Sequence, residues 1–220
     1  MSLSNEPLVN ILFDLGNVLV PVHWERAIER ISPHVSPDNA ALLTQGVWAF
    51  QELVRDPATA LETGQIEMDK FYRTVSTILG LRLSEEEFHD IWCDIFTLDE
   101  QMVELGTWLA QTYSTWLLSN TNAAHYQWIV RRFPRVVFYR AAALSYELGV
   151  MKPDTRYYEL ALRQFNIKPE QSVFIDDREE NVEGALRLGI RGIVFKGVPA
   201  LIRELSALGI KVPEDKGSNL

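Results

Sequence analysis

Short apolar runs alternate with amphipathic stretches along most of the 220-residue chain. Five runs have the length and apolar character of buried strands: VNILFDL (9–15), STWLLSN (114–120), RAAALSY (140–146), SVFIDD (172–177) and RGIVFK (191–196). Helical patterns occupy residues 99–113, 122–133, 153–165, 181–189 and 198–209. Strands joined through helices of this length predict parallel βαβ units. We therefore expect an α/β fold, with a Rossmann-like parallel sheet covered by helices on both faces.

The alternation stops between Pro21 and Leu98, where no run is typical of a strand. The pattern there predicts several helices, with breaks near SPHVSPDN (32–39), RDPATALETGQ (55–65) and GLRLSEEE (80–87). In the third break, Ser84 followed by Glu87 has the spacing of a capping box. We therefore expect a Rossmann-like core domain of residues 1–20 and 99–220, with an inserted α-helical domain of residues 21–98.

The inserted segment is rich in aromatic residues, which we expect to form its core. They are Trp24, Trp48, Phe50, Phe71, Tyr72, Phe88, Trp92 and Phe96. One helical face allows another interpretation, because Trp48, Gln51 and Arg55 lie close together on it and could point toward an active site.

Composition and charge limit the classes of partner. With 47% hydrophobic and 23% charged residues, the chain has the balance of a folded globular protein. Its formal charge of -9 argues against a nucleic acid or an anionic membrane as partner, because both are usually bound by basic surfaces. No apolar run approaches the about 20 residues that span a bilayer. The oligomeric state is not indicated by the sequence.

Cysteine content and the leader predict a cytoplasmic protein. Cys93 is the only cysteine, so no intramolecular disulfide can form, and we expect a buried and unreactive thiol. The leader MSLSNEPL lacks the basic and then apolar pattern of an export signal. This leader and the tail EDKGSNL (214–220) are expected to lie outside the fold.

Polar residues follow three of the predicted strands at the point where each strand ends. They are Asp14 in the first strand, Ser119 and Asn120 in the second, and Asp176 and Asp177 in the fourth. The carboxyl ends of parallel strands meet at one edge of a sheet, so these side chains are expected to converge. Three acids at one place would repel one another, and a hard cation with oxygen ligands, Mg²⁺, would offset that repulsion.

Each of these features also has a purely structural interpretation. Asp176 or Asp177 could cap the helix that follows, and the polar residues of SNTNAAHY (119–126) could do the same for theirs. Lys152, in GVMKPD (149–154), could be an ordinary surface lysine. The order of the clusters along the chain favours the functional interpretation.

In chain order, FDLGNVL (13–19), LLSNTN (117–122), GVMKPD (149–154) and VFIDDREEN (173–181) resemble the four motifs of the haloacid dehalogenase superfamily. The resemblance covers residues 9–20 and 99–209, the strand-rich part of the chain. A helical insertion after the first motif is similar to the cap domain of one subgroup of this family, subfamily IA. LETGQIEMDKF (61–71) also resembles a stretch found in such caps.

The resemblance implies a phosphatase mechanism. Asp14 would be the nucleophile that attacks phosphorus and becomes an aspartyl phosphate. Ser119 and the backbone amide of Asn120 would bind the phosphoryl oxygens. Lys152 would neutralise both the phosphate and the nucleophile.

The resemblance also implies Mg²⁺ as cofactor. Asp14, the backbone carbonyl of Gly16 and Asp177 would hold the ion, and Asp176 would be the acid beside them. The implied substrate is a small phosphorylated metabolite, with a sugar phosphate as the preferred class.

Gly16 departs from the pattern of the family's phosphatases, which usually carry a second aspartate two residues after the nucleophile as general acid. General acid catalysis typically contributes about 10²- to 10⁴-fold in rate. Its loss argues against a phosphoryl mutase, whereas a phosphatase could use a good leaving group, water or a residue of the cap. His23 and Glu25 are the nearest candidates in the sequence. Asn17 could have a catalytic role, or Gly16-Asn17 could simply be a turn that tolerates positive φ.

Two other functions remain open at this point. Metal-independent 2-haloacid dehalogenases of the same superfamily also lack the second aspartate, but they usually lack the acidic pair that Asp176 and Asp177 form. A catalytically weak module that binds a phosphorylated metabolite or a protein would resemble the phosphatase, yet Asp14 and Lys152 are both present. The sequence therefore predicts a Mg²⁺-dependent phosphatase.

Overall fold

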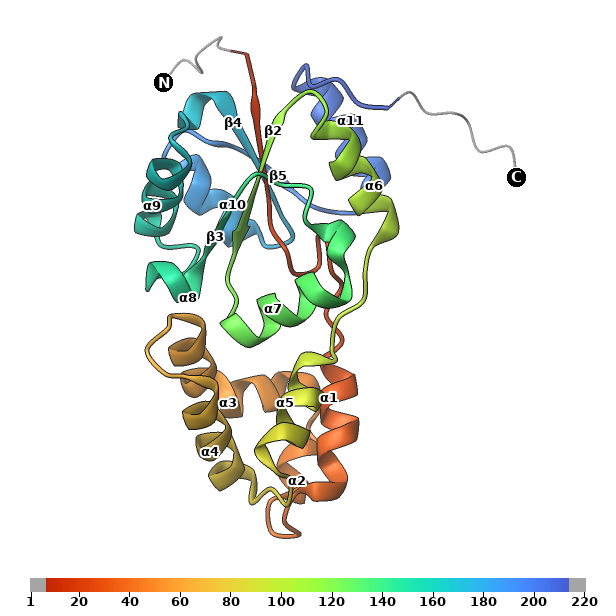
Figure 1. Ribbon diagram of the computed structural model, residues 1–220, viewed down its shortest axis with the longest axis vertical. Helices are drawn as coiled ribbons and strands as arrows, with labels where there is room; N and C mark the ends of the chain where they lie inside the picture. The colour runs from red at the N-terminus through yellow and green to blue at the C-terminus, as the bar shows by residue number, and fades with distance from the viewer. Residues whose placement is uncertain (1–6, 214–220) are drawn as a thin grey trace, which may run out of the picture.

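A parallel sheet forms the centre of the upper part of the molecule (Figure 1). The computed structural model describes residues 7–213, so most of the leader and all of the tail EDKGSNL lie outside the described residues. Within that range, five strands pair in the order β3-β2-β1-β4-β5, and every pairing is parallel. The strands are β1 (Asn10–Phe13), β2 (Ser114–Ser119), β3 (Ala142–Leu144), β4 (Ser172–Asp176) and β5 (Arg191–Val194).

Helices cover both faces of this sheet, and the predicted Rossmann-like α/β class is confirmed. One apolar cluster joins the sheet to α6 (Glu100–Leu109), α7 (Ala123–Arg132) and α11 (Val198–Ala207). A second cluster joins it to α9 (Thr155–Phe165) and α10 (Glu179–Leu186). The side chains of β1 alternate between the two clusters, with Ile11 and Phe13 in the first and Leu12 in the second.

Several element boundaries in this domain differ from the prediction, and two of the differences have a local cause. The third strand is shorter, because Ser145 begins the short helix α8 (Ser145–Leu148). The Ser145 hydroxyl donates to the backbone oxygen of Thr121 at 3.0 Å and accepts from the backbone nitrogen of Thr121 at 2.9 Å, which turns the chain inward. Helix α9 begins at Thr155, because the Asp154 side chain caps it with a 2.9 Å hydrogen bond.

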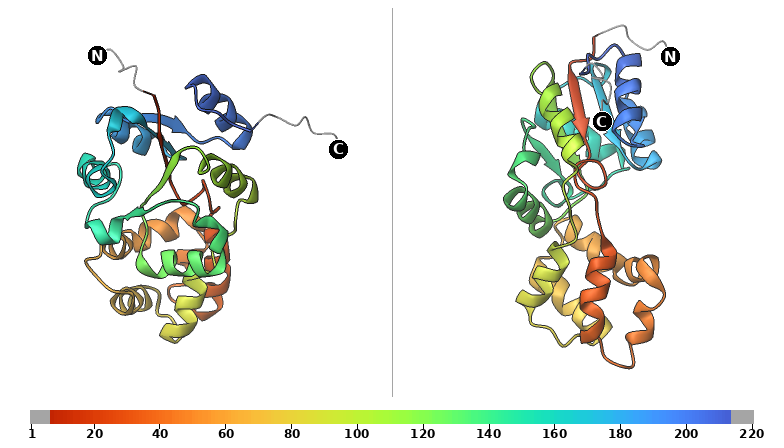
Figure 2. Two further views of the ribbon diagram at one scale, coloured as in Figure 1. Left: turned by 45° about the horizontal axis from the view of Figure 1, so that its top comes forward. Right: turned by 90° about the vertical axis from the view of Figure 1, so that its right-hand side faces the viewer.

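A separate group of helices, called here the helical unit (residues 24–93), lies beyond the carboxyl ends of the strands (Figures 1 and 2). Its helices are α1 (Trp24–Ile31), α2 (Ala40–Leu43), α3 (Gly46–Glu62), α4 (Met68–Leu79) and α5 (Glu85–Cys93). The predicted capping box is confirmed: the Ser84 hydroxyl accepts from the Glu87 amide at 3.2 Å, and the Glu87 carboxylate accepts from the Ser84 amide at 2.8 Å.

The predicted break at residues 55–65 is wrong in its first part, because α3 continues through Pro57 and ends at Glu62. A proline inside a helix removes one backbone hydrogen bond and crowds the preceding turn. Val54 and Leu61 are buried on either side of Pro57, and their burial offsets that cost. Together with α4, the long helix α3 forms one side of the helical unit.

Two linkers connect the helical unit to the sheet, and they lie side by side. Val22 in the first and Phe96 in the second form an antiparallel bridge. The backbone N–H of His23 donates to the carbonyl of Ile95 at 2.7 Å. The His23 ring lies 2.8 Å from the Thr97 hydroxyl of the other linker. His23 is thus a residue of the junction between the two parts.

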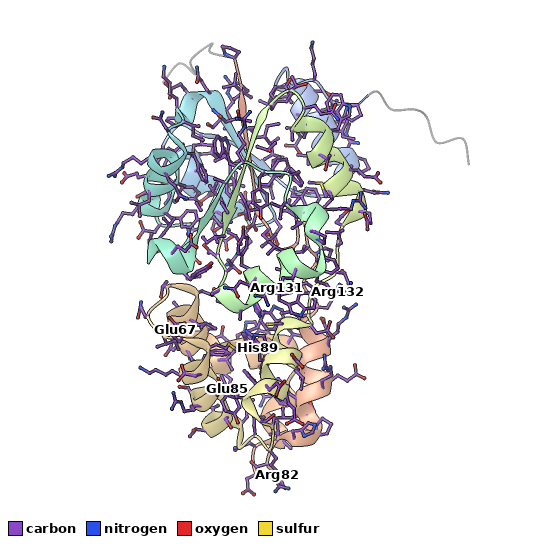
Figure 3. All side chains as sticks on the ribbon, viewed as in Figure 1. Glu67, Arg82, Glu85, His89, Arg131 and Arg132 are labelled. Atoms are coloured by element: carbon purple, nitrogen blue, oxygen red, sulfur yellow. The ribbon has the colours of Figure 1, made fainter. Side chains whose placement is uncertain are left out.

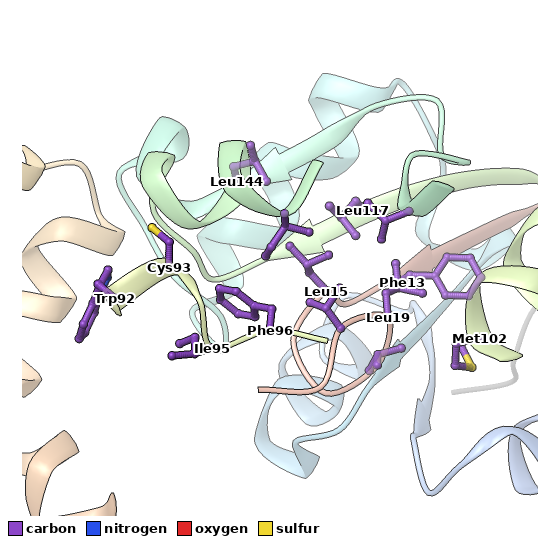
Figure 4. Close-up of a cluster of buried hydrophobic side chains, with 14 of the residues drawn as sticks. Phe13, Leu15, Leu19, Trp92, Cys93, Ile95, Phe96, Met102, Leu117 and Leu144 are labelled. Carbon is purple, nitrogen blue, oxygen red and sulfur yellow. The ribbon is translucent and has the colours of Figure 1, made fainter. Parts of the chain in front are cut away.

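A continuous apolar cluster crosses this junction. Figure 4 shows it passing from Phe13 and Leu117 on the strands through Phe96 to Trp92 and Cys93 in α5. Cys93 is buried as expected, and burial raises the pKa of its thiol to about 12. In residues 7–213, no helix is both long and apolar enough to cross a membrane.

The aromatic core expected in the helical unit is largely present. Phe50, Phe71, Phe88 and Trp92 are buried, and the ring centroids of Phe71 and Trp92 lie 4.7 Å apart. Trp48 differs, because it is 73% exposed. The expectation of a core position is therefore wrong for Trp48.

Gly106 on α6 allows a close approach that supports β1. A Cβ atom added at Gly106 would lie 2.2 Å from Phe138, whose ring packs edge-on against Phe13 with a centroid distance of 5.3 Å.

Alanine is better than glycine in a helix by about 1 kcal/mol, but overpacking costs about 1–3 kcal/mol. We expect Gly106→Ala to lower the free energy of unfolding in urea. Thr107→Ala, on the exposed side of α6, is the control and should change it little; equal stability of both variants would contradict the packing argument.

Candidate active site

Three neighbouring strands end at the polar residues that were predicted to converge. Because β1 lies between β2 and β4, Asp14 comes beside Ser119 at the end of β2 and Asp176 at the end of β4. The backbone N–H of Asp14 donates to the carbonyl of Ile175 at 2.9 Å, which extends the pairing of β1 with β4. The chain changes direction across the sheet at β1, and open α/β sheets bind ligands at such switch points.

The Lys152 ammonium group lies at the centre of this edge. Its Nζ atom donates to Asp14 Oδ1 at 2.8 Å, to Asp176 Oδ2 at 2.7 Å and to the carbonyl of Leu118 at 2.9 Å. The side chain is 1% exposed, so Lys152 is not a surface lysine. Burial alone would lower the pKa of Lys152, but the carboxylates of Asp14 and Asp176 outweigh it and raise that pKa above its usual value. The lysine is therefore a buried cation.

Asp14 is buried but faces the ligand side of the edge, where it lines a cavity. Burial raises the pKa of Asp14, the positive charge of Lys152 opposes that rise, and the negative charge of Asp176 adds to it. Its second oxygen is not used by Lys152. A carboxylate held in this way is fixed in direction and presents one oxygen to a ligand.

Asp176 is completely buried, and its oxygens are used by the protein itself. Besides Lys152, it accepts hydrogen bonds from Asn181 Nδ2 at 2.9 Å and 3.1 Å and from the backbone nitrogen of Arg178 at 2.9 Å. These bonds fix the carboxylate against Lys152. Asp176 does not line the cavity, whereas the other predicted nucleophile, phosphate-binding and metal-binding residues do: Asp14, Gly16, Ser119, Asn120, Lys152 and Asp177.

Asp177 is half-buried and contacts the turn that follows β1. Asn17 Nδ2 donates to Asp177 Oδ2 at 3.1 Å, and Asn17 Oδ1 accepts from the backbone nitrogen of Val22 at 3.1 Å. Asn17 also has a φ of 54°, the left-handed conformation that asparagine tolerates. Asn17 thus has the conformational role considered from the sequence, and it contacts Asp177 as well.

The cavity has a volume of about 270 Å³ and lies between the sheet edge and the helical unit. Trp24, Gln51 and Glu62 line it from the helical unit. Of the helical face considered above, only Gln51 lines the cavity, and Trp48 and Arg55 do not.

Neither His23 nor Glu25, the nearest candidates in the sequence for a replacement acid, lines this cavity. His23 is directed to the other linker instead, and Glu25 is an exposed residue in the first turn of α1. The structure therefore does not support the hypothesis that either residue donates a proton at the site.

Asn120 positions the loop that carries Lys152. Its Nδ2 atom donates to the backbone oxygen of Lys152, and its Oδ1 atom accepts from the backbone nitrogen of Lys152, both at 2.9 Å. Two residues further on, Asn122 caps the start of α7, because its Oδ1 atom accepts from the His125 amide at 3.0 Å. The Asn122 side chain is therefore the helix cap considered from the sequence, while Ser119 and Asn120 remain at the cavity.

His125 lines the same cavity and connects α7 to the helical unit. Its Nε2 atom lies 3.0 Å from the carbonyl of Trp92, and its Nδ1 atom lies 3.2 Å from Asn122 Nδ2. These partners require a neutral ring, with Nε2–H as donor and Nδ1 as acceptor. Burial lowers the pKa of His125 to about 4, although the hydrogen bond to Trp92 opposes this.

The carboxylates of this edge could hold a metal ion. One oxygen atom from each of Asp14, Asp176 and Asp177 lies within 4.8 Å of the others. Burial raises the pKa of Asp177, the hydrogen bond from Asn17 opposes this, and the charge of Asp176 adds to it. Asn181 Oδ1, which is buried in a residue lining the cavity, has no hydrogen-bond partner among the described residues. Oxygen donors with excess negative charge fit Mg²⁺ better than a soft metal.

Several cavity residues were missed by the sequence reasoning. Asn181 lies in the first helical turns after the acidic pair, where its spacing from Asp176 was a usable signal. Glu62 lies in the stretch 61–71 that resembles part of a family cap, but only the placement of the helical unit brings it to the cavity. Arg178 and His125 were not singled out either, although they lie inside the stretches 173–181 and 119–126.

Known proteins are similar to this chain over most of its length. A family model for haloacid dehalogenase-like hydrolases matches residues 10–189. The chain is 26% identical to a D-ribitol-5-phosphate phosphatase of Bacteroides thetaiotaomicron, over 82% of this chain and 88% of that protein. It is 27% identical to a sesquiterpene phosphatase of Aspergillus oryzae, over 90% of this chain and 94% of that protein. A solved haloacid dehalogenase family enzyme of Bacteroides thetaiotaomicron, a magnesium complex, has a TM-score of 0.75 and 27% identity, covering 87% of this chain and 94% of that one.

Removing the buried cation should destabilise the protein. Lys152→Met leaves the buried carboxylates of Asp14 and Asp176 without their partner, and breaking such a pair typically costs about 3–5 kcal/mol. We expect a large loss in the free energy of unfolding, measured in urea without added metal. Lys196→Met, at an exposed position, is the matched control. Equal unfolding midpoints for the two variants would contradict the role given to Lys152.

His125 should make the protein less stable as the pH falls. Because its pKa is about 4 in the folded state and about 6.5 unfolded, the unfolded chain binds more protons between these values. A difference of one pKa unit corresponds to about 1.4 kcal/mol. The free energy of unfolding should therefore fall by up to about 3 kcal/mol as the pH drops from 6.5 to 4, because His125 resists protonation in the folded state. We expect His125→Gln to reduce the fall in melting temperature over this pH range. His34→Gln is the control, and an unchanged pH dependence in His125→Gln would refute the assignment.

Proposed function

This chain belongs to the haloacid dehalogenase-like hydrolases, and on that premise we propose that it is a Mg²⁺-dependent phosphatase of a small phosphorylated metabolite. The observation that carries the proposal is the buried cluster in which Lys152 joins Asp14 and Asp176, with Asp177 beside it, at the carboxyl ends of β1 and β4. The cluster offers a nucleophile and a fixed cation, which suit an anionic substrate. Its excess carboxylates suit a metal ion that binds together with that substrate.

Asp14 is the nucleophile in this proposal. One oxygen of its carboxylate attacks phosphorus, the bond to the ester oxygen breaks, and an aspartyl phosphate forms. Water then attacks the same phosphorus atom and releases inorganic phosphate. Lys152 holds Asp14 in position through the 2.8 Å bond and offsets the repulsion between this carboxylate and the incoming phosphate.

Ser119 and Asn120 belong to the phosphate side of the cavity. Ser119 offers its hydroxyl group at the end of β2. The Asn120 side chain is engaged with the Lys152 backbone, so the backbone amide of Asn120 is the group assigned to the phosphoryl oxygens. Lys152 contributes its positive charge rather than a hydrogen bond, because its three N–H groups already donate to Asp14, Asp176 and the carbonyl of Leu118.

Asp14, the carbonyl of Gly16 and Asp177 are the residues assigned to Mg²⁺. Asp176 was expected beside them; its bonds to Lys152, Asn181 and the Arg178 amide favour a positioning role instead. When bound, the ion supplies positive charge that offsets the repulsion between the phosphate and the carboxylates.

The helical unit is assigned as a cap, with residues 21–98 inserted into a core of residues 1–20 and 99–220. Residues of both parts line the cavity, and the paired linkers around Val22 and Phe96 are the place where the two parts could move relative to each other. Closing the cavity would keep bulk water from the aspartyl phosphate.

The cavity supports a polar metabolite rather than a large cofactor. Its volume of about 270 Å³ suits a phosphate group with a short carbon chain. From the helical unit, Gln51 and Glu62 offer hydrogen-bonding groups that could bind the hydroxyl groups of a substrate. Trp24 offers an aromatic surface. A sugar phosphate or polyol phosphate is therefore the preferred substrate class, in keeping with the relative named as a D-ribitol-5-phosphate phosphatase. The relative named as a sesquiterpene phosphatase supports the phosphatase activity alone.

Phosphate release tests this function directly. We expect Mg²⁺-dependent release from sugar phosphates and from an activated aryl phosphate, with loss of activity in EDTA and in Asp14→Asn, because the amide cannot act as nucleophile. Asp94→Asn, an exposed acid at the end of α5, is the control that should retain activity. No release from any phosphate ester would contradict the proposal. Chloride release from a 2-haloacid without metal would favour the dehalogenase. Binding of a phosphate ester without its turnover would favour the binding module.

A further inference from the structure

The general acid that is missing at Gly16 can be sought among the carboxyl groups of the cavity. Among the described residues that line it, the acidic side chains are Asp14, Glu62 and Asp177. Asp14 is assigned as nucleophile, and Asp177 is held by Asn17 on the side of the assigned metal ligands. Glu62 is the remaining acid, and it enters the cavity from the helical unit.

The end of α3 is seated directly on the sheet domain, which fixes Glu62 over the cavity. Glu62 is the last residue of α3, and Gly64 follows two residues later with a φ of +66°. A Cβ atom added at Gly64 would lie 2.3 Å from the carbonyl oxygen of Tyr146 in α8. Glycine is thus required at this contact both for its conformation and for its lack of a side chain. The approach of Gly64 to α8 thus places the end of α3, where Glu62 lies, against the sheet domain.

The surroundings of Glu62 suit a group that gives up and takes back a proton. Glu62 is half-buried. This burial raises the pKa of Glu62 to about 7, and the positive charge of Arg178 opposes that rise. Arg178 extends from the start of α10 and also lines the cavity. The other charged or titratable groups that line it are Asp14, Lys152, Asp177 and His125.

We propose that Glu62 is the general acid and base of the reaction, supplied by the helical unit in place of a side chain at position 16. The inference rests on the proposed phosphatase function. As Asp14 bonds to phosphorus and the bond from phosphorus to the ester oxygen breaks, the carboxyl proton of Glu62 passes to that oxygen, and a neutral alcohol leaves. The Glu62 carboxylate then takes a proton from the water that attacks phosphorus, the bond between phosphorus and Asp14 breaks, and inorganic phosphate is released.

A series of aryl phosphates with leaving groups of different acidity tests this role. The value of kcat/KM reports only the steps up to departure of the alcohol, so the second step does not enter. For phenyl phosphate, a poor leaving group, we expect Glu62→Gln to lower kcat/KM by about 10²- to 10⁴-fold. For nitrophenyl phosphate, which needs no proton, the same variant should change kcat/KM by less than about 10-fold.

Three further measurements support the test. Wild-type kcat/KM for phenyl phosphate should fall as the pH rises above about 7, where Glu62 loses its proton, and Glu62→Gln should lack this limb. Glu67→Gln is the matched control, because Glu67 is an exposed glutamate of the helical unit that does not line the cavity (Figure 3). It should behave as wild type with every ester. Glu62→Asp keeps an acid and should recover part of the phenyl phosphate activity.

The outcomes separate this proposal from the function on which it rests. An equal loss for all esters in Glu62→Gln would mean that Glu62 only binds substrate, and the proton-transfer role would be overturned. Wild-type kinetics in Glu62→Gln would overturn it as well. If the wild type released no phosphate even from nitrophenyl phosphate, the phosphatase function itself would fail.

Discussion

The whole site depends on one buried ammonium group. Lys152 Nζ joins the ends of three strands, through Asp14 after β1, the Leu118 carbonyl in β2 and Asp176 in β4. Two carboxylates that are almost fully buried would not remain charged so close together without this cation. Their mutual position, and with it the direction of Asp14, is therefore set by Lys152. The loop that carries Lys152 is in turn fixed by the two hydrogen bonds with Asn120.

The turn after Asp14 is ordered by Asn17 and not by a side chain at position 16. Gly16 forms a bridge with Val20, and Asn17 in the left-handed conformation reaches Asp177 and the Val22 amide. The turn thus organises one side of the site without an acidic side chain. If Glu62 supplies the proton, as proposed, the chemistry is complete only when the helical unit lies against the sheet. Such an arrangement couples closure of the site to reaction.

The sequence predicted the sheet and its site well, because strand-end residues follow from local pattern and parallel topology. Asp14, Ser119 and Asp177 needed only the strand boundaries and the rule that carboxyl ends meet. The helical unit was harder. Its Pro57 was read as a break, although burial of the residues around it keeps α3 continuous, and Trp48 was placed in the core although it is exposed. Glu62 depends on how the unit docks on α8, a long-range contact that no local pattern contains.

The covalent intermediate is the central claim of this account, and it can be observed directly. The enzyme should be mixed with Mg²⁺ and an activated aryl phosphate, quenched in acid within the first turnovers and analysed by mass spectrometry before and after proteolysis. The account predicts the mass of one added phosphoryl group on the peptide that contains Asp14, and no such adduct in Asp14→Asn. Turnover without any adduct on that peptide, or an adduct on another residue, would contradict it.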